Sequence, residues 1–62
     1  MTYLLINYEF PPLGAGAATA TKYLGAALSR RGNRVVVLTS AYKGLPPVSE
    51  EDGMTVIRLL TL

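Results

Sequence analysis

The chain has 62 residues, of which half are hydrophobic and 16% are charged, and its formal net charge is +2. This length allows one small domain, and the high apolar content excludes an intrinsically disordered chain. Cysteine and histidine are both absent. Their absence excludes disulfide frameworks, zinc sites built on these residues, and catalysis by either side chain.

The charged residues are few, and their spacing argues against two kinds of site. The basic residues are Lys22, Arg30, Arg31, Arg34, Lys43 and Arg58, and the acidic residues are Glu9, Glu50, Glu51 and Asp52. Nucleic-acid-binding proteins concentrate cations in a stripe, whereas these cations are dispersed. Three of the four carboxylates are consecutive, so they do not supply a separated catalytic pair or a calcium cage. We expect no nucleic-acid partner, no metal and no cofactor.

The apolar segments are short, which bears on the cellular location. None reaches the roughly 20 residues that span a bilayer, and no basic segment precedes the first run, as a secretory signal would require. We therefore expect a cytoplasmic protein. Four cations are candidates for binding the anionic inner face of a membrane from the cytoplasmic side: Lys22, Arg30, Arg31 and Lys43. The alternative is that they simply face water.

The first half of the chain predicts a strand, a loop and a helix. Residues 3–8 are apolar without alternation, which indicates a strand covered on both faces. A loop with a proline pair covers residues 9–16, and a helix covers residues 17–31. The expected apolar stripe consists of Ala17, Ala20, Leu24, Ala27 and Leu28. Gly25 lowers helix stability by roughly 1 kcal/mol relative to alanine, so we expect it to pack closely on a neighbour.

The second half predicts two more strands. Gly32 ends the helix as a C-terminal cap, and residues 34–39 form a β-branched strand. Residues 40–53 are expected to be a loop without regular structure, and residues 54–60 a third strand. The order strand–helix–strand indicates the start of a parallel, Rossmann-like α/β sheet.

This set of elements does not complete such a fold. One helix covers one face only, whereas the first two strands are expected to be buried on both. The chain also stops within the apolar run of residues 59–62. We therefore expect residues 1–62 to be the first part of a larger α/β domain. By the same reasoning, the isolated chain should self-associate.

The candidate binding site lies where the first strand leads into the helix. Ligands of open α/β sheets bind at the carboxyl ends of the strands. The expected helix start has no Ser, Thr, Asp or Asn cap, and glycines let a ligand approach the backbone closely. Gly14, Gly16 and the amide of Ala17 are thus candidates for binding a phosphate or diphosphate. The alternative is a plain tight turn whose amides are hydrated.

Other residues of this region have two interpretations each. Glu9 and Phe10 follow the first strand and are candidates for lining a ligand pocket there, or they are an exposed carboxylate and a packed aromatic ring. The second strand ends with Thr39 and Ser40. They are candidates for lining the same ligand pocket, or they have a structural role only.

Two common phosphate-binding motifs are not complete in this segment. Residues 14–19 begin as G-x-G-x-x-G, but Thr19 replaces the third glycine. No acidic residue follows Leu38 to hold a ribose, which argues against a dehydrogenase. No G-x-x-x-x-G-K-[ST] sequence occurs, so a P-loop is excluded here.

The sequence resembles the N-terminal part of group 1 (family 4) glycosyltransferases of the GT-B fold. The resemblance lies in the opening loop N-Y-E-F-P-P-L-G-A-G-A at residues 7–17, and in L-S-R-R-G-N followed by V-V-V-L-T at residues 28–39. It covers essentially the whole chain. Two positions depart from the usual pattern, because Ala15 stands where many members have a glycine and Asn33 where many have a histidine.

The resemblance implies a hexosyltransferase that moves a sugar from a nucleotide-sugar donor to a sugar or lipid-linked acceptor. Such enzymes have two Rossmann-like domains, of which the N-terminal one mainly receives the acceptor. Gly14, Gly16 and Ala17 would then approach the donor diphosphate when the domains close. The donor-binding domain and the catalytic groups would lie beyond Leu62, so this segment alone is expected to be inactive.

Two alternatives remain at this point. One is another nucleotide-dependent α/β enzyme. The other is a non-catalytic α/β interaction module, since the exposed edges of an incomplete sheet invite pairing with other chains.

Overall fold

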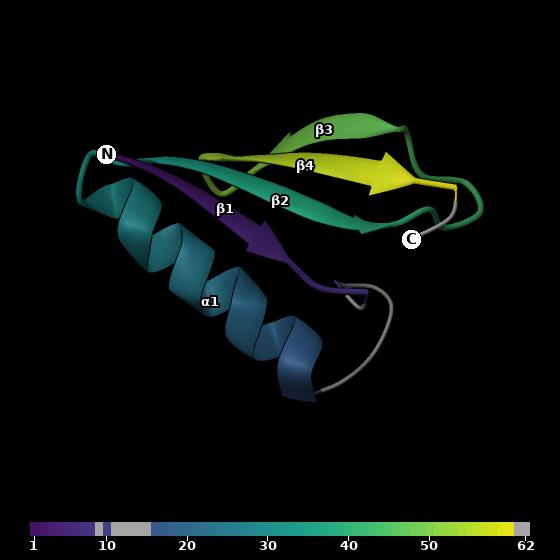
Figure 1. The fold of residues 1–62 in the computed structure, drawn as a ribbon, viewed down its shortest axis with the longest axis horizontal. Coiled ribbons are helices and arrows are strands. Elements are labelled where there is room, and N and C mark those ends of the chain that lie inside the picture. Colours follow the sequence, from purple (N-terminus) through teal and green to yellow (C-terminus); the bar gives the residue numbers. More distant parts are fainter. Residues whose placement is uncertain (9, 11–15, 61–62) are drawn as a thin grey trace.

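In the part of the chain that the structure describes, four strands form one mixed sheet and one helix packs against one of its faces (Figure 1). The computed structural model describes residues 1–8, 10 and 16–60. The elements are β1 (Thr2–Ile6), α1 (Gly16–Arg30), β2 (Arg34–Ser40), β3 (Val48–Glu51) and β4 (Met54–Leu59). The strand order is β1-β2-β4-β3, with β1, β2 and β4 parallel and β3 antiparallel to β4. The chain is thus a small α/β domain.

The strand–helix–strand prediction is confirmed, because β1 and β2 are parallel neighbours and α1 connects them. The prediction of an unstructured loop over residues 40–53 is wrong, because it contains β3. Asp52 and Gly53 join β3 to β4 with φ angles of 51° and 80°. Asp-Gly is a preferred pair for a two-residue hairpin turn that needs positive φ at both positions. The Asp52-Gly53 pair therefore predicts the β3–β4 hairpin from the sequence.

The core lies between α1 and the sheet. It consists of Phe10, Ala26, Val35, Val37, Met54 and Val56, and Leu5 and Leu28 pack against it. Gly25 lies over this cluster, and a Cβ atom there would collide with the Met54 side chain. The expectation that Gly25 packs closely on a neighbour is confirmed.

The face that α1 turns to the sheet differs from the predicted stripe. Ala18, Gly25 and Ala26 are buried, whereas Ala20 and Leu24 are exposed. The prediction holds for Leu28, which packs against the core, and is wrong for Ala20 and Leu24. The helix carries apolar residues on much of its circumference, so periodicity alone did not select the buried side. The bulky Met54 side chain needs a helix surface of small residues, and this requirement belongs to the packed structure.

The end of α1 follows the predicted cap. Gly32 has a φ of 87°, and its N–H donates to the Ser29 carbonyl at 2.9 Å. The Asn33 N–H donates to the Leu28 carbonyl at 3.3 Å, and its side-chain amide reaches the same oxygen at 2.9 Å. These contacts form a Schellman motif, which satisfies carbonyl groups that the helix end leaves unpaired. No helix in the described part of the chain is long and apolar enough to cross a membrane.

The sheet face opposite α1 carries an apolar row that crosses all four strands. The row consists of Ile6, Leu38, Ile57 and Val48, which are direct neighbours in the strand register. The first predicted strand was expected to be buried on both faces, yet Ile6 is 67% exposed. Val48, in the segment predicted to be a loop, is 56% exposed. Figure 1 shows why, because α1 lies on the other side of the sheet. We call this surface the open face.

Candidate functional site

Loops gather at one edge of the sheet. Because β1, β2 and β4 are parallel, their carboxyl ends lie at the same edge. The connection from β1 to α1 and the segment that follows β2 both leave from there. This edge is where open α/β sheets bind their ligands, so it is the candidate functional site.

Two hydrogen bonds hold the chain that leaves β1. The Asn7 side-chain amide donates to the Thr21 hydroxyl on α1 at 2.8 Å. The Thr39 hydroxyl, at the end of β2, donates to the Tyr8 carbonyl at 3.2 Å. These contacts attach the start of the connection to both the helix and the sheet, so its direction at the edge is set by the fold.

Two of the predicted diphosphate-binding residues, Gly16 and Ala17, begin α1. Gly16 is the first residue of the helix and is exposed, and no acidic residue occurs in the first turn. A Cβ atom at Gly16 would have no heavy atom within 4 Å, so the space beside its backbone is open. Ala17 is the next helical residue. Glu9 and Gly14 lie outside the described residues.

Phe10 and Thr39 are in the interior. Phe10 belongs to the core cluster and is 2% exposed, which agrees with the interpretation of it as a packed aromatic ring. Thr39 is buried, and its hydroxyl binds the Tyr8 carbonyl. Ser40 is half-buried on the open face beside Leu59. None of these three residues lines the pocket described next.

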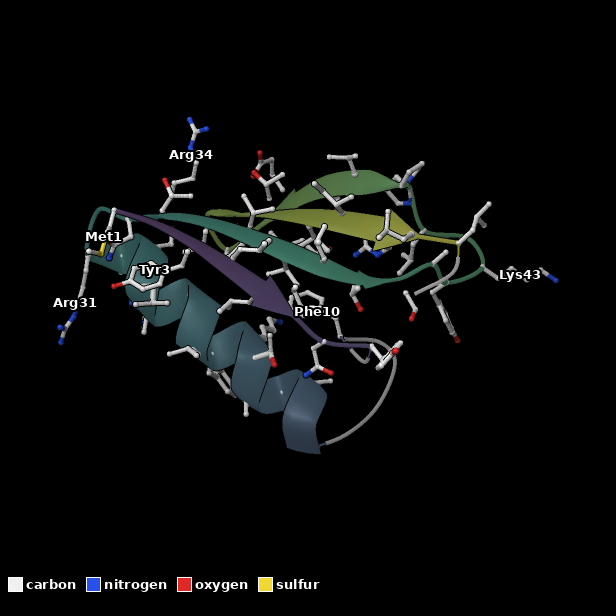
Figure 2. All side chains as sticks on the ribbon, viewed as in Figure 1. Met1, Tyr3, Phe10, Arg31, Arg34 and Lys43 are labelled. Carbon is white, nitrogen blue, oxygen red and sulfur yellow. The ribbon has the colours of Figure 1, made fainter. Side chains whose placement is uncertain are left out.

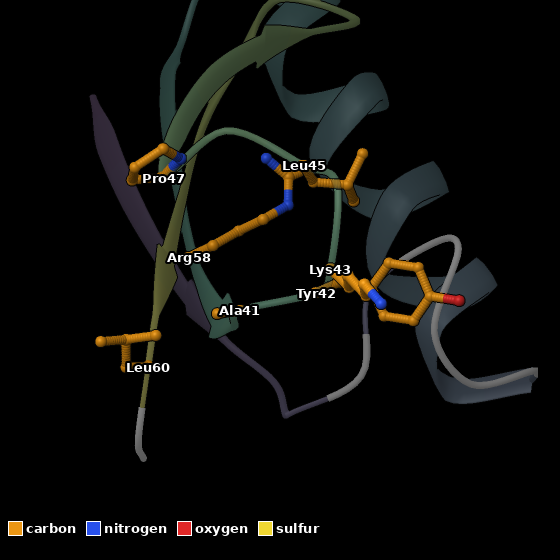
Figure 3. A pocket seen from close by; sticks show the side chains of 7 residues that line it. All are labelled: Ala41, Tyr42, Lys43, Leu45, Pro47, Arg58 and Leu60. Carbon is orange, nitrogen blue, oxygen red and sulfur yellow. The ribbon is translucent and has the colours of Figure 1, made fainter.

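A pocket of about 590 Å³ does open at this edge, between the ends of β2 and β4 (Figure 3). Its lining residues are Ala41, Tyr42, Lys43, Leu45, Pro47, Arg58 and Leu60. A hydrogen bond from the Leu45 N–H to the Tyr42 carbonyl, at 3.1 Å, closes the turn that forms one wall. Lys43 extends away from the sheet in Figure 2, whereas the guanidinium of Arg58 lies toward Leu45 in Figure 3. The pocket thus combines mainly apolar walls with one buried cation.

The Arg58 guanidinium donates to three acceptors, and no prediction from the sequence singled this residue out. Its side chain is 3% exposed and donates to the Glu51 carboxylate at 2.7 Å. It also donates to the Ser49 hydroxyl at 2.8 Å and to the Pro46 carbonyl at 3.1 Å. Alternation along β4 could have indicated this position, because Arg58 follows Met54 and Val56 on the buried face. The network joins β3, β4 and the pocket wall.

The other described carboxylates also have partners. Glu50 accepts from the Thr55 hydroxyl at 3.0 Å, and Asp52 lies 3.8 Å from the Lys22 ammonium. The described residues contain no group of three or more potential acidic, histidine or cysteine metal ligands. For binding a ligand, the described edge offers the backbone amides at the start of α1 and the mainly apolar walls of the pocket.

Comparison with known proteins found no similar chain. No family model matches this sequence, and no match was found among curated proteins or among solved structures.

Proposed function

We propose that the chain is the acceptor-side segment of a sugar transferase that uses a nucleotide-sugar donor. In this proposal the sheet is the first part of a Rossmann-like domain. The start of α1 approaches the donor diphosphate, and the acceptor lies at the same edge of the sheet. The resemblance of residues 7–17 and 28–39 to group 1 glycosyltransferases supports this function.

One structural observation carries the proposal. The start of α1 and the pocket beside Arg58 both lie toward the carboxyl ends of the parallel strands. A donor diphosphate at the amides of Gly16 and Ala17 would be favoured by the positive end of the helix dipole. An acceptor with an apolar part could use the neighbouring walls formed by Tyr42 and Leu45. The transferred sugar would pass between these two positions.

The diphosphate part of the proposal can be tested on the chain itself. We would titrate isotope-labelled protein with inorganic diphosphate and follow the backbone amide signals by NMR, with chloride at equal ionic strength as the control. The signals of Gly16 and Ala17 should shift in a saturable way. Gly16→Val should weaken binding at least tenfold, because it obstructs approach to the backbone.

The substitution Gly16→Val should not disturb the packing or the backbone at this position. Gly16 is not among the residues with positive φ, and a Cβ there meets no heavy atom within 4 Å. The matched control is Ala20→Val, one turn further along the exposed side of α1. Equal affinity of both variants for diphosphate would contradict the assignment and leave a plain helix start.

Transfer activity should need a second, donor-binding domain. The isolated chain should not turn over nucleotide sugars above a buffer control. In an enzyme that contains both domains, Gly16→Val should lower kcat/KM by about tenfold to a thousandfold, the range for lost oxyanion-type contacts. Turnover by the isolated 62-residue chain would contradict this division of roles.

A second candidate function is a non-catalytic interaction module. The apolar row from Ile6 to Val48 on the open face favours it, because large exposed apolar surfaces mark interaction sites. An interaction module would show no saturable diphosphate binding at α1. The same titration therefore separates the two candidates.

A further inference from the structure

The two edges of the sheet are built differently. The β3 edge is four residues long, contains Glu50 and Glu51, and follows a proline pair at residues 46–47. Short length, charge and proline are the devices by which proteins keep an edge strand from pairing with another chain. The β1 edge has the sequence T-Y-L-L-I, which lacks both charge and proline. The β3 edge is thus protected against pairing with another chain, whereas the β1 edge is not.

The backbone hydrogen bonds show which groups of β1 face outward. The Arg34 N–H donates to the Met1 carbonyl at 2.9 Å, and the Asn7 N–H donates to the Leu38 carbonyl at 3.1 Å. Met1 and Asn7 therefore turn their backbone groups toward β2. Alternate residues of a strand point their backbone groups to the same side. The odd-numbered residues between them also face β2.

The even-numbered residues of β1 consequently present their amides and carbonyls at the free edge. These residues are Thr2, Leu4 and Ile6. Among the described residues no strand lies beyond β1, which ends the strand order. Leu4 is at the centre of β1, so the outward groups are arranged symmetrically about it.

We infer that the β1 edge binds the β1 edge of a second copy of the chain, in antiparallel orientation, with the two-fold axis at Leu4. In this register Leu4 faces the partner's Leu4, and Thr2 faces the partner's Ile6. Each of these residues has outward backbone groups, so each pair can exchange both N–H to carbonyl hydrogen bonds. The arrangement satisfies every outward group of β1 at once.

The side chains are compatible with this register. On the open face Leu4 lies beside the partner's Leu4, and on the other face Tyr3 lies beside the partner's Leu5. No β1 residue is charged, so no like charges meet across the new pair. The contact is the same patch on both copies, as a two-fold interface requires.

The protected edge explains why the partner is one copy and not a growing chain of copies. After pairing, the two sheets continue as one, with a β3 strand at each outer end. Both outer ends then carry the prolines and the carboxylates of Glu50 and Glu51. Further addition is blocked, so the structure favours a closed dimer. This inference concerns the 62-residue chain itself and does not use the diphosphate assignment at α1.

A pair of variants at one position tests edge pairing. Leu4→Pro removes an outward N–H that makes no bond to β2, and edge strands tolerate proline at such positions. Leu4→Thr removes the same leucine side chain but keeps the N–H. Sedimentation equilibrium of the full 62-residue chain should show a dimer for the parent and for Leu4→Thr. Leu4→Pro should weaken dimerisation at least tenfold.

Three sedimentation outcomes would overturn the inference. The first is a parent chain that remains monomeric at high micromolar concentration. The second is association that continues beyond the dimer. The third is equal dimerisation of Leu4→Pro and Leu4→Thr. The third result would indicate that two copies of the chain associate through the open face and not through the β1 edge. Circular dichroism is recorded for each variant to show that the fold is retained.

Cross-linking provides a second test that does not depend on proline. The chain has no cysteine, so single-cysteine variants report only the introduced contact. Leu4 and Val48 are both 56% exposed and lie on opposite edges of the open face. Leu4→Cys should form a disulfide-linked dimer under mild oxidation, because Cα atoms of a hydrogen-bonded pair are about 5.5 Å apart. Val48→Cys should cross-link at least tenfold more slowly, and equal rates would overturn the inference.

Discussion

The guanidinium of Arg58 on β4 donates to the carboxylate of Glu51 on β3 across 2.7 Å, and the Arg58 side chain is almost completely buried. A buried cation depends on its counter-ion, because unpaired charges are costly to keep away from water. The contact therefore joins the two strands of the hairpin and holds the pocket wall at the carboxyl edge.

Glu51→Gln should destabilise the protein far more than a charge removal nearby. The variant keeps an acceptor for Arg58 but removes its counter-charge, so we expect the free energy of unfolding to fall by about 1.5–3 kcal/mol. The control is Asp52→Asn, which removes the exposed pair with Lys22 at 3.8 Å and should change stability by about 0.5 kcal/mol or less. Urea unfolding followed by circular dichroism measures both, and equal losses would contradict the role given to Arg58.

Gly25→Ala should be destabilising even though alanine is the better helix former. The added Cβ meets the Met54 side chain, which is fully buried and has little room to move. Overpacking of this kind costs about 1–3 kcal/mol. Gly16→Ala is the control, since nothing lies within 4 Å of its Cβ, and it should leave the melting temperature unchanged or slightly raised.

A double variant separates overpacking from other effects at Gly25. Met54→Val shortens the side chain that the new methyl group meets. The combined loss of Gly25→Ala and Met54→Val should be smaller than the sum of the two single losses by more than about 0.5 kcal/mol. Simple additivity would show that Met54 is not the contact that matters.

Gly53→Ala should weaken the β3–β4 hairpin. The residue has a φ of 80°, which disfavours a side chain by about 1–2 kcal/mol, and its new Cβ would also meet the Ser29 hydroxyl. Adding Ser29→Ala should recover the part of the loss that is due to this contact and leave the backbone strain. Thermal unfolding of the two single variants and the double variant measures both parts. A Gly53→Ala variant as stable as the parent would contradict the turn geometry.

Thr39→Val should loosen the attachment of the chain that leaves β1. The buried Thr39 hydroxyl donates to the Tyr8 carbonyl at 3.2 Å, and its loss leaves that carbonyl without this donor. We expect a loss of about 0.5–1.5 kcal/mol. Thr55→Val is the matched control in β4, where the hydroxyl binds the carboxylate of Glu50 at an exposed position. Denaturant unfolding should show the larger effect at Thr39.

The sequence alone determined the strand–helix–strand order and the end of α1. Apolar runs with β-branched residues predicted the strands that the structure shows as β2 and β4, and Gly32 predicted the C-terminal cap of α1. These features depend on local conformational preferences, which short stretches of sequence carry. β3 was missed although Asp52-Gly53 is a strong hairpin signal, because Val48–Glu51 is short and half acidic.

Only the tertiary structure decided which surfaces are used and which are left open. The face of α1 on the sheet was set by the fit of Gly25 over Met54, and the Arg58 network required residues from three segments. The position of β1 at an edge, and of Phe10 in the core, likewise follows from long-range packing. Such contacts join residues far apart in the chain, and local periodicity does not encode which of two apolar faces is buried. The free edge of β1 and the open face are therefore properties of the assembled sheet.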